Sequence, residues 1–144
     1  MALVKTLRSS LVALLLLVVV GVARADEPES VHWEMDIDKA KQMAKESGRP
    51  MLIFVTMQGC HYCTQMKETT LVDPALVDEV NDDFVSAYVD ESKNRELVRS
   101  LGIRSFPTTL IATPDGRVRE MVRGYVGADA LRQRMRTVRT ALRG

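Results

Sequence analysis

The sequence Met51-Leu-Ile-Phe-Val-Thr-Met-Gln-Gly-Cys-His-Tyr-Cys63 places the only two cysteines of the chain directly after an apolar run. The continuous run Met51–Val55, with proline before it and glycine soon after it, is typical of a buried central strand. Residues i and i+3 of a first helical turn lie about 5 Å apart, so Cys60 and Cys63 can form a disulfide without backbone movement. Closing so short a loop removes only about 2 kcal/mol of chain entropy, which favours a redox reagent over a structural link.

The first 25 residues have the pattern of a cleaved signal peptide. Lys5 and Arg8 precede an apolar run from Leu11 to Ala23, and Ala23-Arg24-Ala25 fits a small-x-small cleavage site. The run has 13 residues, fewer than the roughly 20 that span a bilayer, and an uncleaved membrane anchor is the alternative. We therefore expect residues 1–25 to be removed and the mature protein to be periplasmic or secreted, where disulfides form and persist.

Cleavage after Ala25 would leave 119 residues, which is enough for one compact domain. The leader contains Lys5, Arg8 and Arg24, so the mature chain would carry 17 basic and 19 acidic residues and a net charge of −2. This balance argues against a general nucleic-acid partner. We expect residues 26–35 to be a flexible segment leading into the fold, residues 36–144 to form the domain, and the protein to be a monomer.

The rest of the chain alternates helical and strand patterns. Helices are predicted from about Asp36 to Ser47, after Cys63, from Pro74, from Asn94 to Leu101 and around residues 131–142; strands are predicted over residues 51–55, 84–89, 108–112 and 118–122. The strand-helix-strand unit requires a parallel crossover, and the late hairpin adds antiparallel strands. The order predicts an α/β fold with a mixed central sheet covered by helices on both faces. The last helix carries Arg132, Arg136, Arg139 and Arg143 on a face that we expect to be solvated.

The cysteine pair has the features of a redox site. A thiol attacks a disulfide as the thiolate, and a helix N-terminus would stabilise that charge on Cys60. His61 would add positive charge when protonated, and Tyr62 would tune the helix start or line the rim of the site. Cys63, one turn deeper and more buried, would then resolve the mixed disulfide by attacking Cys60.

Two other interpretations of the pair exist. It could be an inert disulfide at a loop–helix junction, although the spacing in a strand–helix context points to redox chemistry. Alternatively, the thiolates with His61 or Met57 could hold copper(I) or zinc, as in a copper-binding chaperone. A closed zinc site needs four ligands, and beyond the motif the chain offers only His32. We therefore expect no metal in the site and keep the chaperone as the alternative function of another class.

Several separate motifs together resemble the thioredoxin superfamily, from about Asp36 to Leu142. They are Met51–Val55, Gly59-Cys-His-Tyr-Cys63, Gly102-Ile-Arg-Ser-Phe-Pro-Thr108, Asp115-Gly116 and Gly124-Tyr125. Within that superfamily, Lys67-Glu68-Thr69-Thr70, Asp73-Pro74 and Val89-Asp90 most resemble the C-terminal thioredoxin-like domain of periplasmic transmembrane thiol:disulfide reductases. The resemblance implies a three-layer thioredoxin-like fold and a thiol-disulfide oxidoreductase that needs no organic cofactor, because the Cys60–Cys63 pair itself carries two electrons.

The resemblance also implies the partners and the direction of the reaction. The substrates would be protein disulfides, and a membrane or soluble redox partner would recharge the pair. Reduction is the first expectation and disulfide-forming oxidation is the alternative, because a histidine between the cysteines can stabilise the reduced thiolate.

A further implication concerns Pro107 and Phe106. In the family this proline is cis and lies beside the cysteine pair, and the backbone of the residue before it pairs with an extended substrate segment. The sequence also departs from the family at two positions. Many thioredoxins carry Trp where this chain has Gly59, and a buried acid where it has Phe54. The group that assists proton transfer to Cys63 is therefore not evident from the sequence.

Overall fold

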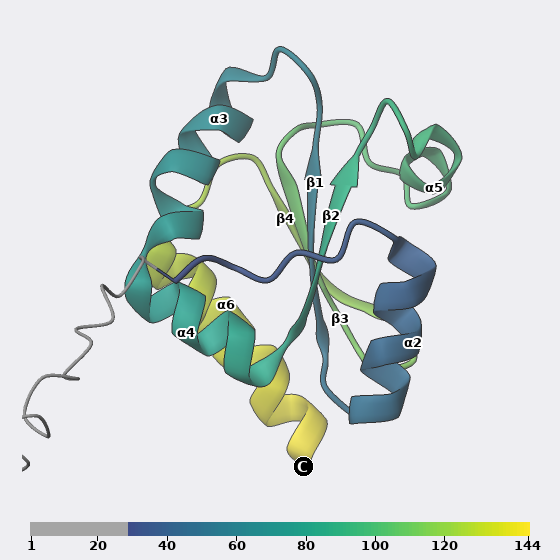
Figure 1. Cartoon of the computed structure of the whole chain (residues 1–144), viewed down its shortest axis with the longest axis vertical. Coiled ribbons are helices and arrows are strands. Elements are labelled where there is room, and N and C mark those ends of the chain that lie inside the picture. The colour runs from purple at the N-terminus through teal and green to yellow at the C-terminus, as the bar shows by residue number, and fades with distance from the viewer. Residues whose placement is uncertain (1–28) are drawn as a thin grey trace, which may run out of the picture.

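The computed structural model describes residues 29–144, so the predicted signal peptide lies outside the described residues. In chain order the elements are α2 (Ile37–Ser47), β1 (Met51–Thr56), α3 (His61–Glu68), the 3-10 helix η1 (Thr70–Val72), α4 (Pro74–Asp83), β2 (Val85–Asp90), α5 (Arg95–Ser100), β3 (Thr108–Ala112), β4 (Val118–Arg123) and α6 (Ala128–Arg143) (Figure 1). Across this part of the chain, no helix is both long enough and apolar enough to cross a bilayer.

The four strands form one mixed sheet in the order β2-β1-β3-β4. β1 is parallel to β2 and antiparallel to β3, and β3 is antiparallel to β4. The connection from β1 to β2 contains α3, η1 and α4, since parallel neighbours require a long crossover, whereas a short turn suffices between β3 and β4. The mixed sheet predicted from the sequence is therefore confirmed.

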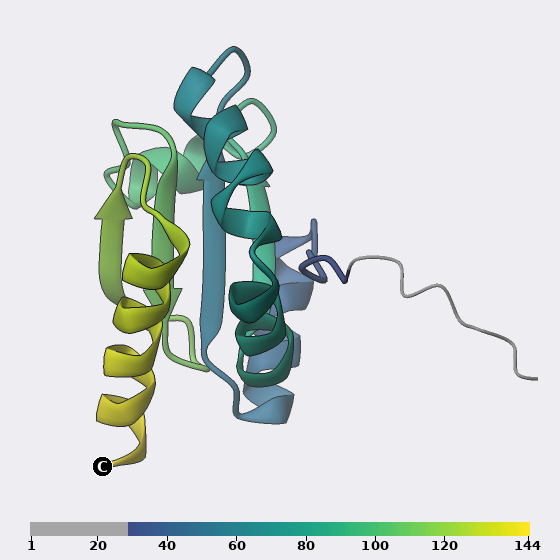
Figure 2. The same cartoon turned by 90° about the vertical axis from the view of Figure 1, so that its left-hand side faces the viewer.

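The core consists of two apolar clusters, one on each face of the sheet. Leu52, Phe54 and Ile111 face a layer built from α3, α4 and α6. Met51, Ile53 and Val55 face α2 and α5. Figure 1 shows the two layers on either side of the sheet, and Figure 2 shows the same layers after a quarter turn. All six residues of β1 are buried, which explains why its sequence is an unbroken apolar run rather than an alternating one.

The segment before α2 is more ordered than we predicted. Val31 is only 5% exposed, and Trp33 packs against the core cluster under α3, α4 and α6. Glu34 forms a parallel bridge to Ala87, with its N–H donating to Ser86 O (2.9 Å) and its carbonyl accepting from Tyr88 N (2.9 Å). The expected flexible segment is therefore wrong for residues 31–34, which lie along the edge of β2; residues 26–28 lie outside the described residues.

The arginine face of α6 is also not the freely solvated surface that we predicted. Arg132 and Arg136 pair with Glu79 of α4 at 3.2 and 3.1 Å. Arg139 and Arg143 pair with Asp83 at the end of the same helix. The periodicity of α6 located the face correctly, but the acidic residues of α4 that contact it are more than 50 positions away in the sequence.

Candidate active site

The cysteine pair is positioned by the end of β1 and the start of α3. After Thr56 the chain turns through Met57, Gln58 and Gly59, and α3 begins at His61. Gly59 has φ +69°, a left-handed conformation that glycine adopts without steric cost. A tryptophan, which many thioredoxins carry at the matching position, would be strained on this backbone.

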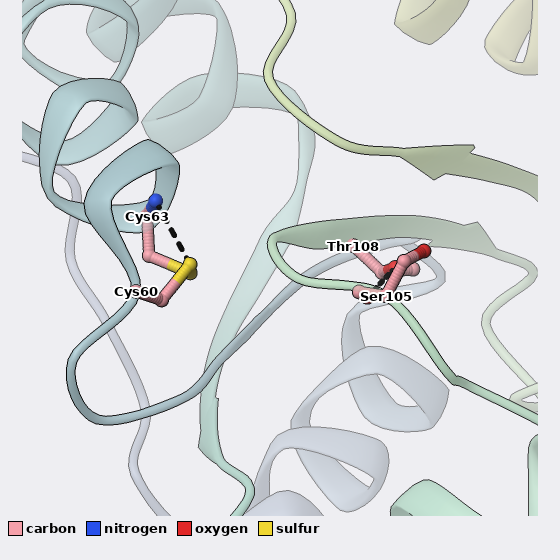
Figure 3. Close-up of a disulfide and its surroundings, with 4 residues drawn as sticks. All are labelled: Cys60, Cys63, Ser105 and Thr108. Carbon is pink, nitrogen blue, oxygen red and sulfur yellow. Dashed lines mark hydrogen bonds between the residues drawn. A yellow bond between two sulfur atoms is a disulfide. The ribbon is translucent and has the colours of Figure 1, made fainter.

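Cys60 and Cys63 are joined in a disulfide with their Cα atoms 5.2 Å apart, in agreement with the spacing argued from the sequence. Cys60 is the N-cap of α3, and its Sγ accepts a hydrogen bond from the backbone N–H of Cys63 (3.2 Å) (Figure 3). Cys63 is 1% exposed, whereas Cys60 is half-buried. Of the two sulfur-bearing residues, Cys60 is therefore the one that a second protein can reach.

The electrostatic setting of Cys60 favours negative charge on its sulfur. The first turn of α3 contains no acidic residue, so the N–H groups and the dipole of the helix act on Sγ without a competing carboxylate. His61 and Tyr62 are both exposed, with ring centroids 5.4 Å apart in an edge-to-face arrangement. Both predicted tuning residues thus lie on the solvent side of the disulfide.

The segment before β3 lies at the same end of the sheet as the cysteine pair. Thr108 pairs in register with Val55 of β1, and Figure 3 shows the sulfur atoms directed toward the segment from Ser105 to Thr108. The peptide bond between Phe106 and Pro107 is cis. Two hydrogen bonds hold this segment in place: Thr108 Oγ1 donates to Ser105 O (2.7 Å), and Gly124 N donates to Pro107 O (2.7 Å).

The backbone N–H and carbonyl of Phe106 are unpaired in this segment. Its ring is half-buried against the cluster under α2 and α5. No backbone hydrogen bond within residues 29–144 involves the N–H or the carbonyl of Phe106. The structure thus places Phe106 and Pro107 at the same end of the sheet as the cysteine pair, with the N–H and the carbonyl of Phe106 unpaired.

Below the site, position 54 contributes an aromatic ring instead of a carboxylate. Phe54 is fully buried, and its ring centroid lies 6.1 Å from that of Trp33 and 5.8 Å from that of Tyr88. The rings of Trp33 and Tyr88 are themselves 6.0 Å apart. This three-ring cluster was missed at the sequence level, because Trp33 belongs to the segment that we expected to be loose.

A second feature that the sequence did not reveal is the contact between Tyr125 and the end of α3. The Tyr125 hydroxyl lies 3.2 Å from Thr69 Oγ1, and Thr70 Oγ1 donates to Val126 O (2.6 Å). Hydrogen bonds with Thr69 and then Thr70 lower the pKa of Tyr125 below its ordinary value. These contacts fasten the helix that carries the cysteines to the β4–α6 loop, 56 residues away in the sequence.

The candidate metal ligands can be located as well. Met57 and His61 are exposed beside the disulfide, and in this oxidised state neither cysteine is a thiolate, so copper(I) binding would require reduction first. Within residues 29–144, no group of three or more His, Cys, Asp or Glu side chains is placed to share a metal ion.

Comparisons with known proteins agree with this geometry. The family described as "Thioredoxin-like domain" matches residues 37–139. The solution structure of a thioredoxin from Thermus thermophilus superposes with a TM-score of 0.68 at 24% identity, covering 76% of this chain and 87% of that one. The DsbD C-terminal domain of Neisseria meningitidis, in its reduced form, superposes with a TM-score of 0.59 at 20% identity, covering 69% and 90%.

Among curated proteins, an uncharacterized protein of Caenorhabditis elegans is 27% identical over 93 residues, which cover 59% of this chain. The match spans only 13% of the length of that relative. The thioredoxin-like fold together with the close-spaced cysteine pair supports thiol–disulfide oxidoreductase activity. The family match, which takes in the cysteine pair and the Phe106–Pro107 segment, shows that the chain belongs to the thioredoxin-like domain family.

Proposed function

We propose that the protein is an exported thiol-disulfide oxidoreductase that reduces disulfides in other proteins. One observation carries the proposal: Cys60 is accessible at the N-terminus of α3, with its Sγ accepting a hydrogen bond from Cys63 N (3.2 Å), whereas Cys63 is buried. In the reduced state the same N–H and the helix dipole favour the Cys60 thiolate. The asymmetry of exposure supports a first attack by Cys60 and a second by Cys63.

The reaction is a pair of thiol–disulfide exchanges. The Cys60 thiolate attacks one sulfur of the substrate disulfide, a mixed disulfide forms, and the released substrate thiolate takes up a proton. Cys63 then loses its proton and attacks Cys60 Sγ, which closes the Cys60–Cys63 bond and releases the second substrate thiolate. Two electrons pass from the cysteine pair to the substrate. Cys63 supplies one proton and the solvent supplies the other, because Cys60 reacts as a thiolate; the oxidised form that remains corresponds to the disulfide in the structure.

The segment around Pro107 supports a place for the substrate beside Cys60. The N–H and carbonyl of Phe106 make no backbone hydrogen bond among the described residues, so they are free to pair with an extended peptide as a strand would. The bonds from Gly124 N and Thr108 Oγ1 hold this segment in position. We assign Phe106 and Pro107 to substrate binding on these grounds.

The direction of electron flow rests on resemblance. The motifs at residues 67–70, 73–74 and 89–90 resemble the C-terminal domain of periplasmic thiol:disulfide reductases, and the DsbD C-terminal domain shares this fold. A reductase of this kind needs a membrane or soluble partner that returns two electrons to the Cys60–Cys63 disulfide. The pattern of residues 1–25 supports export to a compartment in which such substrates are found.

A redox titration against glutathione tests this function, combined with an assay of insulin disulfide reduction. We expect a potential near that of a thioredoxin, about −270 mV, together with rapid insulin reduction. A potential near about −120 mV would identify a strong oxidant instead. Tight stoichiometric copper(I) binding with negligible reduction of insulin would favour the chaperone alternative.

A further inference from the structure

The two halves of the described chain carry opposite charge. Residues 29–90 contain 12 acidic and 5 basic side chains, whereas residues 91–144 contain 5 acidic and 12 basic ones, so the formal charges are −7 and +7. The first half supplies β1 and β2, and the second supplies β3 and β4. Because the strand order is β2-β1-β3-β4, the basic half of the chain supplies two adjacent strands at one edge of the sheet.

Most of the basic residues of the second half are neutralised within the fold. The four arginines on one face of α6 pair with Glu79 and Asp83 of α4. Arg95, Arg117 and Arg134 also pair with carboxylates, which belong to Glu91, Asp115 and Glu120. Among residues 29–144, these ion pairs leave four arginines of the second half without a carboxylate partner: Arg99, Arg104, Arg119 and Arg123.

Three of these four unpaired arginines lie around the segment that contains Pro107. Arg99 and Arg104 line a hollow that also includes Phe106. Arg123 pairs in register with Thr108, the residue that follows Pro107. All three are exposed. The unpaired arginines of the second half are therefore concentrated around the segment that contains Pro107.

The hollow has the dimensions and the lining of a docking site for a side chain or a short peptide segment. Its volume is about 290 Å³. Val98, Ile103 and Phe106 contribute apolar surface, and Arg95, Arg99 and Arg104 contribute charge. Glu91, the only carboxylate among the lining residues, pairs with Arg95 at 3.9 Å, so Arg99 and Arg104 remain available to an incoming anion.

We propose that this hollow receives an acidic segment that flanks the reactive disulfide in the substrate protein. The inference rests on the proposed function and names the class of substrate: protein disulfides with Asp or Glu residues close to the cysteine. Exposed charge pairs add little binding energy each, but complementary charge around a site raises the rate of productive encounter. The preference for acidic substrates would therefore appear mainly in the second-order rate constant of disulfide reduction, and it would weaken as salt is added.

Two matched disulfide peptides test this selectivity, one with three Glu residues after the cysteine and one with three Gln residues. The reduced wild-type protein should reduce the Glu peptide about tenfold faster at low salt, and the ratio should fall toward one at high salt. The Arg99→Gln/Arg104→Gln variant should lose the preference. Arg119→Gln is the control, because Arg119 is also exposed and unpaired but does not line the hollow, and it should keep the preference.

A binding measurement separates this inference from the proposed function. The Glu peptide with serine in place of cysteine should shift the backbone amide resonances of residues 99–106, and the double variant should abolish these shifts. If the Gln peptide is reduced as fast as the Glu peptide at low salt, the acidic selectivity is wrong while the reductase function stands. If neither peptide is reduced, the reductase function is wrong, and the amide shifts alone then test the docking site. Shifts confined to the residues of the hollow support the docking site. Shifts elsewhere, or no shifts, contradict it.

Discussion

Cys60 and Cys63 are separated by a single helical turn, yet their surroundings differ in the way that sequential chemistry requires. Cys60 is an N-cap with an extended backbone (φ −87°, ψ 106°), so its sulfur projects from the helix end where unpaired N–H groups lie. Cys63 is inside the first turn and is buried. The N-cap position of Cys60 and the burial of Cys63 together therefore distinguish the two thiols.

Gly59 provides a test of this backbone argument at the scale of one residue. A Cβ at this position would meet no atom within 4 Å, so the cost of Gly59→Ala comes from its φ of +69° alone. We expect a loss of about 1–2 kcal/mol in the free energy of unfolding, measured with urea. Gly59→Asn is the matched variant and should lose less, since asparagine tolerates the left-handed region. An alanine variant as stable as wild type would contradict the backbone geometry.

At the scale of elements, α6 is held on α4 by charge as well as by apolar packing. The Glu79 side chain is only 9% exposed and accepts hydrogen bonds from Arg132 and Arg136. Glu79→Gln would leave Arg136 without a carboxylate, and would leave the largely buried Arg132 with only the exposed Asp129, at 3.6 Å. We expect a loss of about 1–3 kcal/mol in urea unfolding. Lys41→Gln removes an exposed pair with Asp38 on α2 and should change stability by less than about 0.5 kcal/mol; equal effects of the two variants would refute a special role for Glu79.

The segment along β2 should be sensitive to acid. Lys39 Nζ lies 2.6 Å from Glu34 Oε2, and the hydrogen bond from Lys39, followed by the bond from the Asp36 N–H, lowers the pKa of Glu34. A carboxyl with a depressed pKa stabilises the fold above its unfolded pKa, and that contribution is lost as pH falls through its folded pKa.

The stability of wild type should therefore fall more than that of Glu34→Gln between about pH 6 and about pH 3. Urea unfolding across this range measures the difference. Glu96→Gln, a change at an exposed residue of α5, should follow wild type. Parallel pH profiles for wild type and Glu34→Gln would mean that the pair with Lys39 contributes no acid-sensitive stability.

At the scale of the whole molecule, the sequence predicted what depends on local pattern and missed what depends on distant contacts. The apolar run of β1, the caps and the glycine stops predicted the α-helices and strands of residues 29–144, with β2 displaced by a single residue (Val85–Asp90 instead of 84–89), but not the 3-10 helix η1. The cysteine pair was evident because only two residues separate its members. Pro107 was found only through the family resemblance, because nothing in its own neighbourhood links it to residue 60.

The contacts that the sequence did not predict have a common physical cause. Residues 31–34 pair with β2 through bonds that span more than 50 positions, so a short polar stretch gave no sign of the pairing. Tyr125 and Thr69, like Glu79 and the arginines of α6, are complementary only in three dimensions. Local periodicity identifies which face of a helix is polar, but not which element that face will contact.

Export is a prediction about the whole chain. Expressed in a bacterial host, the protein should be recovered from the periplasm with the mass of a chain that begins at Asp26. Placing an arginine in the apolar run, as in Leu15→Arg, should block processing and leave the full-length mass in the cell. A wild-type protein that keeps residues 1–25 and sediments with the membrane would favour the anchor alternative.

The central claim is that Cys60 attacks first and Cys63 resolves the mixed disulfide. The most direct test is to incubate reduced Cys63→Ser and Cys60→Ser variants with a disulfide-containing peptide and to map adducts by mass spectrometry. We predict a stable mixed disulfide on Cys60 in the Cys63→Ser variant. In the Cys60→Ser variant we predict almost no mixed disulfide on Cys63, because Cys63 is buried. Equal trapping by both variants, or faster trapping through Cys63, would contradict the account.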